Sequence, residues 1–338
     1  MRRNKVLVSL AAFLLSFPAA ELLFRLAMPA LEVPERQIEN LRAFDASGNN
    51  RYQPVPYSGF ALRGPGHESE PPQALGWSFR EEKPTGSLRI ACLGGSTTAT
   101  GYPQSLANVL RKKHGVEAEV QNWGVHSWTS VESLVNYFVN VKHHAADIVV
   151  LHHAANDVQA RMWPGFRVDY SHYRRPWRPP ARAAWSRTLL AYSDLYAALV
   201  LRAGSRGFKV ADFVNVPREG RAELSSDTSV TFERSIRSIC ADVARSGGRP
   251  VLLTMAYDPG RAPAQEEWVR GIEEHNIVLR VLAQEEGALL VDFEAWAVQE
   301  PGVGELFDDL VHMTAPGRRQ RATYLAQALV DAGYVTGP

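Results

Sequence analysis

The chain has very little cysteine, with 2 among its 338 residues. Cys92 falls in an apolar pattern typical of a strand and Cys240 in one typical of a helix, so we expect two buried free thiols rather than a disulfide. Apolar surroundings raise the pKa of a thiol and keep it protonated. The position of Cys92, four residues before Ser96, therefore does not make it a nucleophile.

The sequence also lacks a charge bias and any repeated unit. The net charge is +1 with 22% charged residues, which gives no sign of nucleic-acid binding or of an acidic tail. No internal repeat and no coiled-coil heptad is visible. Four histidines invite a metal hypothesis, but no Cys or Glu completes a ligand set, so no metal site is expected at His143, His144, His152 and His153.

The sequence does contain enough apolar residues for a core, at 45% of the chain, and they alternate between two patterns. Short apolar runs predict strands over 88–93, 117–121, 147–152, 250–255 and 288–292. Helical periodicity predicts helices over 102–114, 130–141, 184–203, 229–246, 264–286 and 315–332. Such alternation indicates a parallel sheet with helices on both faces.

Residues 1–30 form a targeting or anchoring segment. Arg2, Arg3 and Lys5 precede an apolar run over 6–20, and the basic head is expected to stay on the cytoplasmic side. A poor cleavage site favours an uncleaved signal anchor over a removed signal peptide, and a soluble packing helix is the third alternative. The following domain then lies outside the cytoplasm, held by one membrane pass at the inner membrane in the first case and secreted in the second. Residues 31–86 are a proline-rich connector.

The stretch over 87–101 is the most informative part of the chain. A buried strand ends at Gly94 and Gly95, and Ser96 then stands on the turn into a helix. A serine in this place lies near backbone N–H groups and the positive end of a helix dipole, which suits a nucleophile in acyl transfer. The same turn is also ordinary helix-capping chemistry. No lysine follows the glycines at the spacing of a phosphate-binding loop.

Three other stretches raise the expectation of catalysis. Asp309 precedes His312 by three residues, so the carboxylate can fix the tautomer of a histidine that acts as general base. Gly124 and Asn156 each follow an apolar run. In an open α/β sheet the carboxyl ends of the strands meet along one edge, so Ser96, Gly124 and Asn156 can converge there.

The order of these four stretches resembles that of the SGNH, or GDSL-like, hydrolase family over about residues 85–330. The resemblance implies a flavodoxin-like three-layer α/β/α sandwich with a mainly parallel five-stranded sheet over 87–335. It also implies a nucleophile at Ser96, a base at His312 oriented by Asp309, and an oxyanion hole made by the Ser96 N–H, the Gly124 N–H and the Asn156 amide. Gly95 and Ala154 depart from the family's motifs, which have an acidic residue and a glycine at these positions.

The insertion over 160–182 is rich in arginine and aromatic residues, which suit stacking on sugar faces and pairing with carboxylates or phosphates. It follows Asn156, so it is a candidate lid with Arg161 and Trp163 as substrate contacts. A solvated loop, or contact with anionic lipid headgroups, is the alternative. Trp123, next to Gly124, is either a packing residue or part of an acyl or sugar pocket.

The sequence therefore predicts a membrane-anchored serine esterase that works outside the cytoplasm without a cofactor. The expected substrate is a carboxylic ester, with an O-acetyl group on a polysaccharide as the first choice, and no nucleic-acid partner is expected. An O-acyltransferase with the same reacting residues is one alternative, since only the acceptor differs. A non-catalytic glycan-binding protein on the same scaffold is another.

Overall fold

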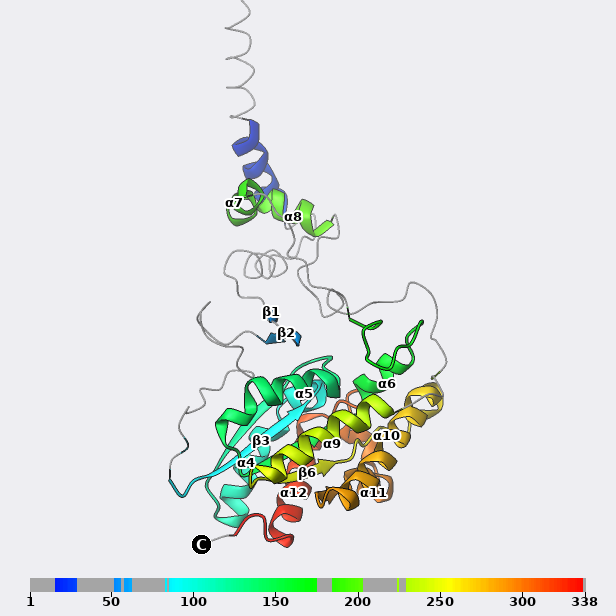
Figure 1. Ribbon diagram of the computed structural model, residues 1–338. Coiled ribbons are helices and arrows are strands. Elements are labelled where there is room, and N and C mark those ends of the chain that lie inside the picture. Colours follow the sequence, from blue (N-terminus) through cyan, green and yellow to red (C-terminus); the bar gives the residue numbers. More distant parts are fainter. Residues whose placement is uncertain are drawn as a thin grey trace, which may run out of the picture. The chain divides into compact units, whose positions relative to one another are not determined.

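The computed structural model describes residues 16–28, 52–55, 58–62, 83, 85–174, 184–202, 224 and 229–336 (Figure 1). The chain divides into two units. The larger comprises 53–176 and 210–338, and the smaller comprises 1–52 and 177–209.

The larger unit is built on a five-stranded sheet in which every neighbouring pair is parallel. Its strands are β3 (Leu88–Gly94), β4 (Ala118–Gly124), β5 (Ile148–His152), β6 (Arg249–Leu253) and β7 (Leu289–Val291). Their order across the sheet is β4-β3-β5-β6-β7. The chain therefore begins with β3, places β4 on one side of it, and adds β5, β6 and β7 in turn on the other side. The five strands predicted from the sequence are confirmed, with boundaries that move by one to three residues.

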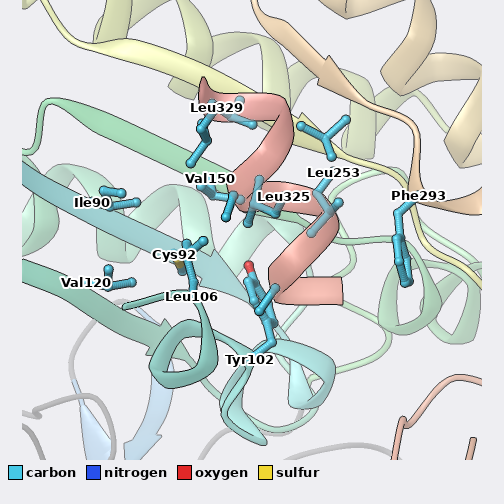
Figure 2. Packing of buried hydrophobic residues seen from close by; sticks show 14 of the residues in the cluster. Ile90, Cys92, Tyr102, Leu106, Val120, Val150, Leu253, Phe293, Leu325 and Leu329 are labelled. Carbon is cyan, nitrogen blue, oxygen red and sulfur yellow. The ribbon is translucent and has the colours of Figure 1, made fainter. Parts of the chain in front are cut away.

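Helices cover both faces of this sheet. One face carries α4 (Tyr102–His114), α11 (Phe293–Gln299) and α12 (Ala315–Asp331), and the other carries α5 (Ser130–Val139), α9 (Val230–Arg245) and α10 (Glu266–Glu285). Alternate residues of β3 feed the two cores: Ile90 and Cys92 pack against the first set of helices, Ala91 and Leu93 against the second. Figure 2 shows Cys92 with Tyr102 and Leu325 in the first core. Both faces being buried explains why the strands read as continuous apolar runs.

Short elements at the strand ends carry no periodic signal and were not predicted. The turn after β3 is the helix α3 (Ser96–Ala99), and the one after β5 is α6 (Ala155–Arg161). A two-stranded sheet of β1 (Tyr52–Val55) and β2 (Gly59–Leu62) lies within the segment expected to be a proline-rich connector. Both cysteines are free and buried, as predicted, and burial raises the pKa of each thiol to about 12.

The smaller unit contains a helix over residues 16–27 and two further helices, α7 (Ala184–Tyr192) and α8 (Asp194–Arg202) (Figure 1). The prediction of one helix over 184–203 is wrong, because the helix is interrupted at Ser193. The Ser193 hydroxyl accepts the Tyr196 N–H at 2.9 Å and so caps α8. Of the expected anchor over 1–30, the first fifteen residues lie outside the described part. Within that part, no helix combines the length and apolar character needed to cross a bilayer.

Candidate active site

Ser96 and His312 meet at the carboxyl edge of the sheet, although 216 residues separate them in the chain. The Ser96 Oγ lies 2.6 Å from the His312 Nε2, and the His312 Nδ1 lies 2.7 Å from an oxygen of Asp309. Hydrogen bonds thus connect the hydroxyl, the ring and the carboxylate in one line. The three side chains expected to react are therefore brought together.

The turn that holds Asp309 and His312 is shaped by its own backbone. The Asp308 N–H donates to the His312 carbonyl at 2.8 Å, which closes the loop. One oxygen of Asp309 accepts the N–H groups of Val311 and His312 at 3.0 and 2.8 Å, leaving the other oxygen for the ring. Burial acts to raise the pKa of Asp309, but these donors and the His312 ring hold its pKa below the usual value. The carboxylate is therefore ionised where it must orient the ring.

Ser96 is the first residue of α3, and its backbone N–H belongs to the free N–H groups of a first helical turn. Contacts to Thr97 and Ala99 hold this turn from two sides. The Thr97 carbonyl accepts a hydrogen bond from the buried Arg321 on α12 at 3.2 Å. Gly124 packs against the far side of α3, since a Cβ added there would lie 2.4 Å from the Ala99 nitrogen. The nucleophile candidate thus stands on a turn clamped between α12 and β4.

Asn156 approaches the same turn closely. Its Nδ2 donates to the Trp128 carbonyl at 2.9 Å, and it would lie 2.4 Å from a Cβ added to Gly95. The absence of a side chain at Gly95 is what admits the amide. A side chain at position 95 would therefore require the Asn156 amide to shift.

Gly124 does not occupy the place expected of an oxyanion donor. Its N–H donates to the Asn122 side chain at 3.0 Å, and Gly124 is not among the residues that line the pocket. Ser127, three residues on, does line it. Ser127 has a φ of +63°, a left-handed conformation uncommon for residues other than glycine, and its carbonyl accepts from Arg174 at 2.9 Å.

The pocket around Ser96 has a volume of about 360 Å³. Besides the reacting residues and Asn156, its lining includes side chains that sequence reasoning missed: Gln159, Met255, Gln265 and Trp268. Met255 follows the end of β6, so the rule that located Asn156 would also have found it. Trp268 is near the start of α10 and carries no comparable signal.

The three predicted substrate contacts lie elsewhere. Trp123 is buried in the second core, where its Nε1 donates to Gln121 at 3.0 Å. Arg161 is buried and joins α6 to α10 by an ion pair with Glu274. Trp163 packs on Tyr173, with ring centroids 5.5 Å apart. None of the three lines the pocket, because each turns toward a neighbouring element instead.

The described part of the insertion folds back onto the protein. Arg174 forms an ion pair with Glu132 at 2.6 Å, and Tyr173 donates to Gln159 at 2.8 Å. Residues 160–174 therefore support the walls of the pocket. The remaining positions of the insertion, including Arg175, Arg178 and Arg182, lie outside the described residues.

Two histidines beside the pocket do not compete with His312 as a base. Burial lowers the pKa of His153 to about 4, and its Nε2 lies 2.8 Å from the Ser133 hydroxyl. Burial and the nearby Arg321 also lower the pKa of His152, to well below the usual value. Both rings are neutral at pH 7. Among the residues that the structure describes, no group of three His, Cys, Asp or Glu is placed to hold a metal ion.

An open α/β sheet that presents a hydrogen-bonded Ser, His and Asp at its carboxyl edge is an arrangement found in enzymes that cleave esters through a serine. The GDSL-like lipase/acylhydrolase family model matches residues 92–320. The chain therefore belongs to the GDSL-like lipase/acylhydrolase family and is a carboxylic ester hydrolase.

Several solved structures are similar to this chain. A lipase/acylhydrolase from Enterococcus faecalis is 15% identical, with 72% of this chain and 96% of that chain covered and a TM-score of 0.47. The acetylxylan esterase Axe2 from Geobacillus stearothermophilus is 17% identical, with coverages of 73% and 94% and a TM-score of 0.44. A GDSL-like lipase from Bacteroides thetaiotaomicron is 14% identical, with coverages of 72% and 88% and a TM-score of 0.42. No curated protein sequence matches the chain.

Proposed function

We propose that the protein is a membrane-anchored serine esterase that removes short acyl groups, such as O-acetyl groups on a glycan, outside the cytoplasm. The observation that carries the proposal is the line of hydrogen bonds from Ser96 through His312 to Asp309. A serine is a weak nucleophile until a base accepts its proton, and the 2.6 Å contact puts the base in place.

The reaction has two halves. The Ser96 Oγ attacks the ester carbonyl while the His312 Nε2 takes the hydroxyl proton, and Asp309 stabilises the imidazolium that forms. The tetrahedral intermediate then expels the alcohol, which receives that proton from His312. In the second half a water molecule, deprotonated by His312, attacks the acyl-enzyme and releases the acid and free Ser96.

The negative charge that develops on the carbonyl oxygen needs hydrogen-bond donors. The Ser96 N–H and the Asn156 amide are the first two, because the amide lies against Gly95 and uses one of its two N–H bonds on Trp128. We assign the third position to the Ser127 N–H in place of Gly124. Ser127 lines the pocket, whereas the Gly124 N–H is bound to Asn122.

The pocket supports a preference for a short acyl group on a glycan. A volume of about 360 Å³ is near the low end for ligand sites and suits a small acyl group with part of its alcohol. The amides of Gln159 and Gln265 can both donate to and accept from hydroxyl groups. Trp268 adds a flat apolar surface beside them, which is the combination expected for a sugar.

A chain-length series tests the acyl preference. Purified protein is given p-nitrophenyl acetate, butyrate and octanoate, with Ser96→Ala as the matched control. The expected kcat/KM is highest for acetate, with the control lower by several orders of magnitude. Equal rates for the two proteins would remove the esterase mechanism, while a preference for octanoate would remove only the short-acyl proposal. Acetylated polysaccharide with and without a free glycan acceptor then separates hydrolysis from transfer.

The location rests on the sequence before residue 21. The basic head and the apolar run over 6–20 support a signal anchor that leaves the domain on the outer side of the inner membrane. Expression of the full chain followed by alkaline extraction of membranes tests this: the protein is expected to remain in the pellet with its original N-terminus. A soluble protein whose N-terminus begins near residue 21 would show instead a removed signal peptide.

A further inference from the structure

The smaller unit has an exposed apolar surface that the esterase mechanism does not use. Among the described residues, fourteen large hydrophobic side chains are exposed, and seven of them belong to this unit: Phe17, Leu22, Leu23, Leu26, Trp185, Tyr192 and Leu199. They come from only two short stretches, 16–28 and 184–202. Such a concentration marks an interaction surface, since exposed apolar residues elsewhere on a soluble protein are scattered.

The helix over 16–27 turns Glu21 toward α8 and leaves its leucines exposed. Glu21 accepts hydrogen bonds from the Ser193 hydroxyl at 2.6 Å and from the Asp194 N–H at 2.7 Å, so it caps the start of α8. Arg25 pairs with Asp194 at 2.9 Å. Leu22 and Leu26, which follow Glu21 and Arg25 in the helix, are 60% and 72% exposed. A helix packed on a soluble domain shows the reverse distribution.

The two-helix hairpin of α7 and α8 packs on this helix through a small core. Met28 lies with Leu190 and Ala197 there, and Phe24 and Tyr196 pack around them. Figure 1 shows the helix over 16–27 beside α7 and α8. The hairpin is thus one structural piece with the segment that follows the apolar run, rather than an independent loop.

The surroundings of this surface indicate its occupant. In the sequence, the residues before this helix form an apolar run preceded by Arg2, Arg3 and Lys5. The stretch over 177–209 has one acidic residue, Asp194, against six basic ones: Arg178, Arg182, Arg187, Arg202, Arg206 and Lys209. Basic residues beside an apolar helical face with Trp and Tyr are the pattern of a segment that lies on an anionic bilayer.

We propose that the α7–α8 hairpin, together with the helix over 16–27, forms a platform that binds the surface of a bilayer containing anionic phospholipid. Leu199 and Tyr192 enter the boundary between headgroups and acyl chains, and the exposed Arg202 lies among the phosphates. This rests on the proposed anchor but goes beyond it, because the hairpin is a second contact more than 150 residues along the chain from the apolar run.

The test places a polarity-sensitive fluorophore on the hairpin of the full chain. The two native cysteines are buried, so an introduced cysteine is the one that reacts. Leu199→Cys is the main variant and Tyr192→Cys a second one in case the first disturbs the hairpin. The matched control is Val298→Cys on α11 of the larger unit, where the native side chain is 70% exposed. Each labelled protein is mixed with vesicles of phosphatidylcholine with or without phosphatidylglycerol, and flotation and p-nitrophenyl acetate hydrolysis are measured separately.

The platform predicts a blue shift at 199 and 192, stronger with phosphatidylglycerol, and quenching of the emission when the lipid tails carry bromine. The label at 298 stays in water. Protein that floats while all labels report water would overturn the platform and leave the anchor intact. Protein that does not float would overturn both the platform and the anchor. The hydrolysis assay would still test the esterase mechanism separately. Shielding at 199 without lipid, in a dimer, would assign the surface to a second copy and overturn the proposal.

Discussion

At the scale of single residues, the site depends on one missing side chain. Gly95 has a φ of −87°, which any residue adopts, so its conformation does not demand glycine. What a side chain would meet is the Asn156 amide, 2.4 Å from the place of a Cβ, so the amide would have to move. The sequence marked Gly95 only as a departure from a motif. The reason is a contact across 61 residues, which no local pattern reports.

Gly95→Ala is therefore expected to push the Asn156 amide away from the oxyanion. Turnover of p-nitrophenyl acetate should fall by about 10² to 10³, the loss typical of one oxyanion donor. Gly260→Ala is the matched control, because the nearest atom to its added Cβ is the end of the Asp258 side chain at 3.2 Å. A Gly95→Ala enzyme with normal turnover would show that the contact between Gly95 and Asn156 does not set the rate.

Asp157, next to Asn156, links the site to the pH dependence of stability. Burial raises the pKa of Asp157 to about 7, against the hydrogen bonds from Ser130 that act to lower it. The native state then holds a proton that the unfolded state, with a pKa of 3.8, has released. The stability from this group is complete below the unfolded value and is lost as pH rises through about 7.

Asp157→Asn removes that dependence. The difference in melting temperature between the variant and the native protein is expected to rise in the variant's favour between pH 5 and pH 8. Asp169→Asn is the control and should show no such trend, because the Ser171 hydroxyl and N–H lower the pKa of Asp169 below 3.8 and this carboxylate is ionised in both states from pH 5 to pH 8. The measurement is the melting temperature of each protein across that pH range. A constant difference between Asp157→Asn and the native protein would contradict the raised pKa.

At the scale of elements, the insertion supports the site from behind. Glu132 lies in the first turn of α5 and accepts from Thr129, and Arg174 joins it from the insertion. Burial alone raises the pKa of Glu132, but the Arg174 charge outweighs it and keeps the pKa below the usual value. The ion pair therefore ties the loop that carries Ser127 to the insertion.

Arg174→Met leaves the Glu132 charge buried without its partner. The free energy of unfolding should fall by about 3 kcal/mol, and turnover should fall as the Ser127 loop loosens. The double variant with Glu132→Gln and Arg174→Met should lose less stability than the sum of the two single variants. The reason is that Glu132→Gln then removes a charge that Arg174→Met has already left without a partner. Denaturant unfolding of all four proteins measures this, and strict additivity would show that the pair contributes no coupling.

The elements themselves were largely predictable, and the exceptions have physical reasons. Buried strands and long amphipathic helices carry their own periodicity, so their positions follow from the sequence. The helix α3 has four residues and is held by Arg321 and by packing on Gly124, so nothing local predicts it. Trp123 could not be assigned to core or pocket because both faces of β4 are buried.

At the scale of the whole molecule, the site exists only because the sheet topology brings distant segments to one edge. Gly94 at the end of β3 pairs with Gly124 on one side and with His152 on the other, so the turns after three strands converge. Ser96 and His312 meet there from the two ends of the domain. The order of the motifs predicted this meeting, but Gln159 of α6 and Trp268 of α10 also line the pocket, and the motifs do not include them.

The most direct test of the central claim is covalent labelling with a fluorophosphonate, which reacts with a serine only when a base activates it. Labelled protein is digested and the modified residue is located by mass spectrometry in the native chain, Ser96→Ala and His312→Ala. We predict one adduct on Ser96, no adduct in Ser96→Ala, and labelling slowed by orders of magnitude in His312→Ala. An adduct on another serine, or labelling that survives Ser96→Ala unchanged, would contradict the account.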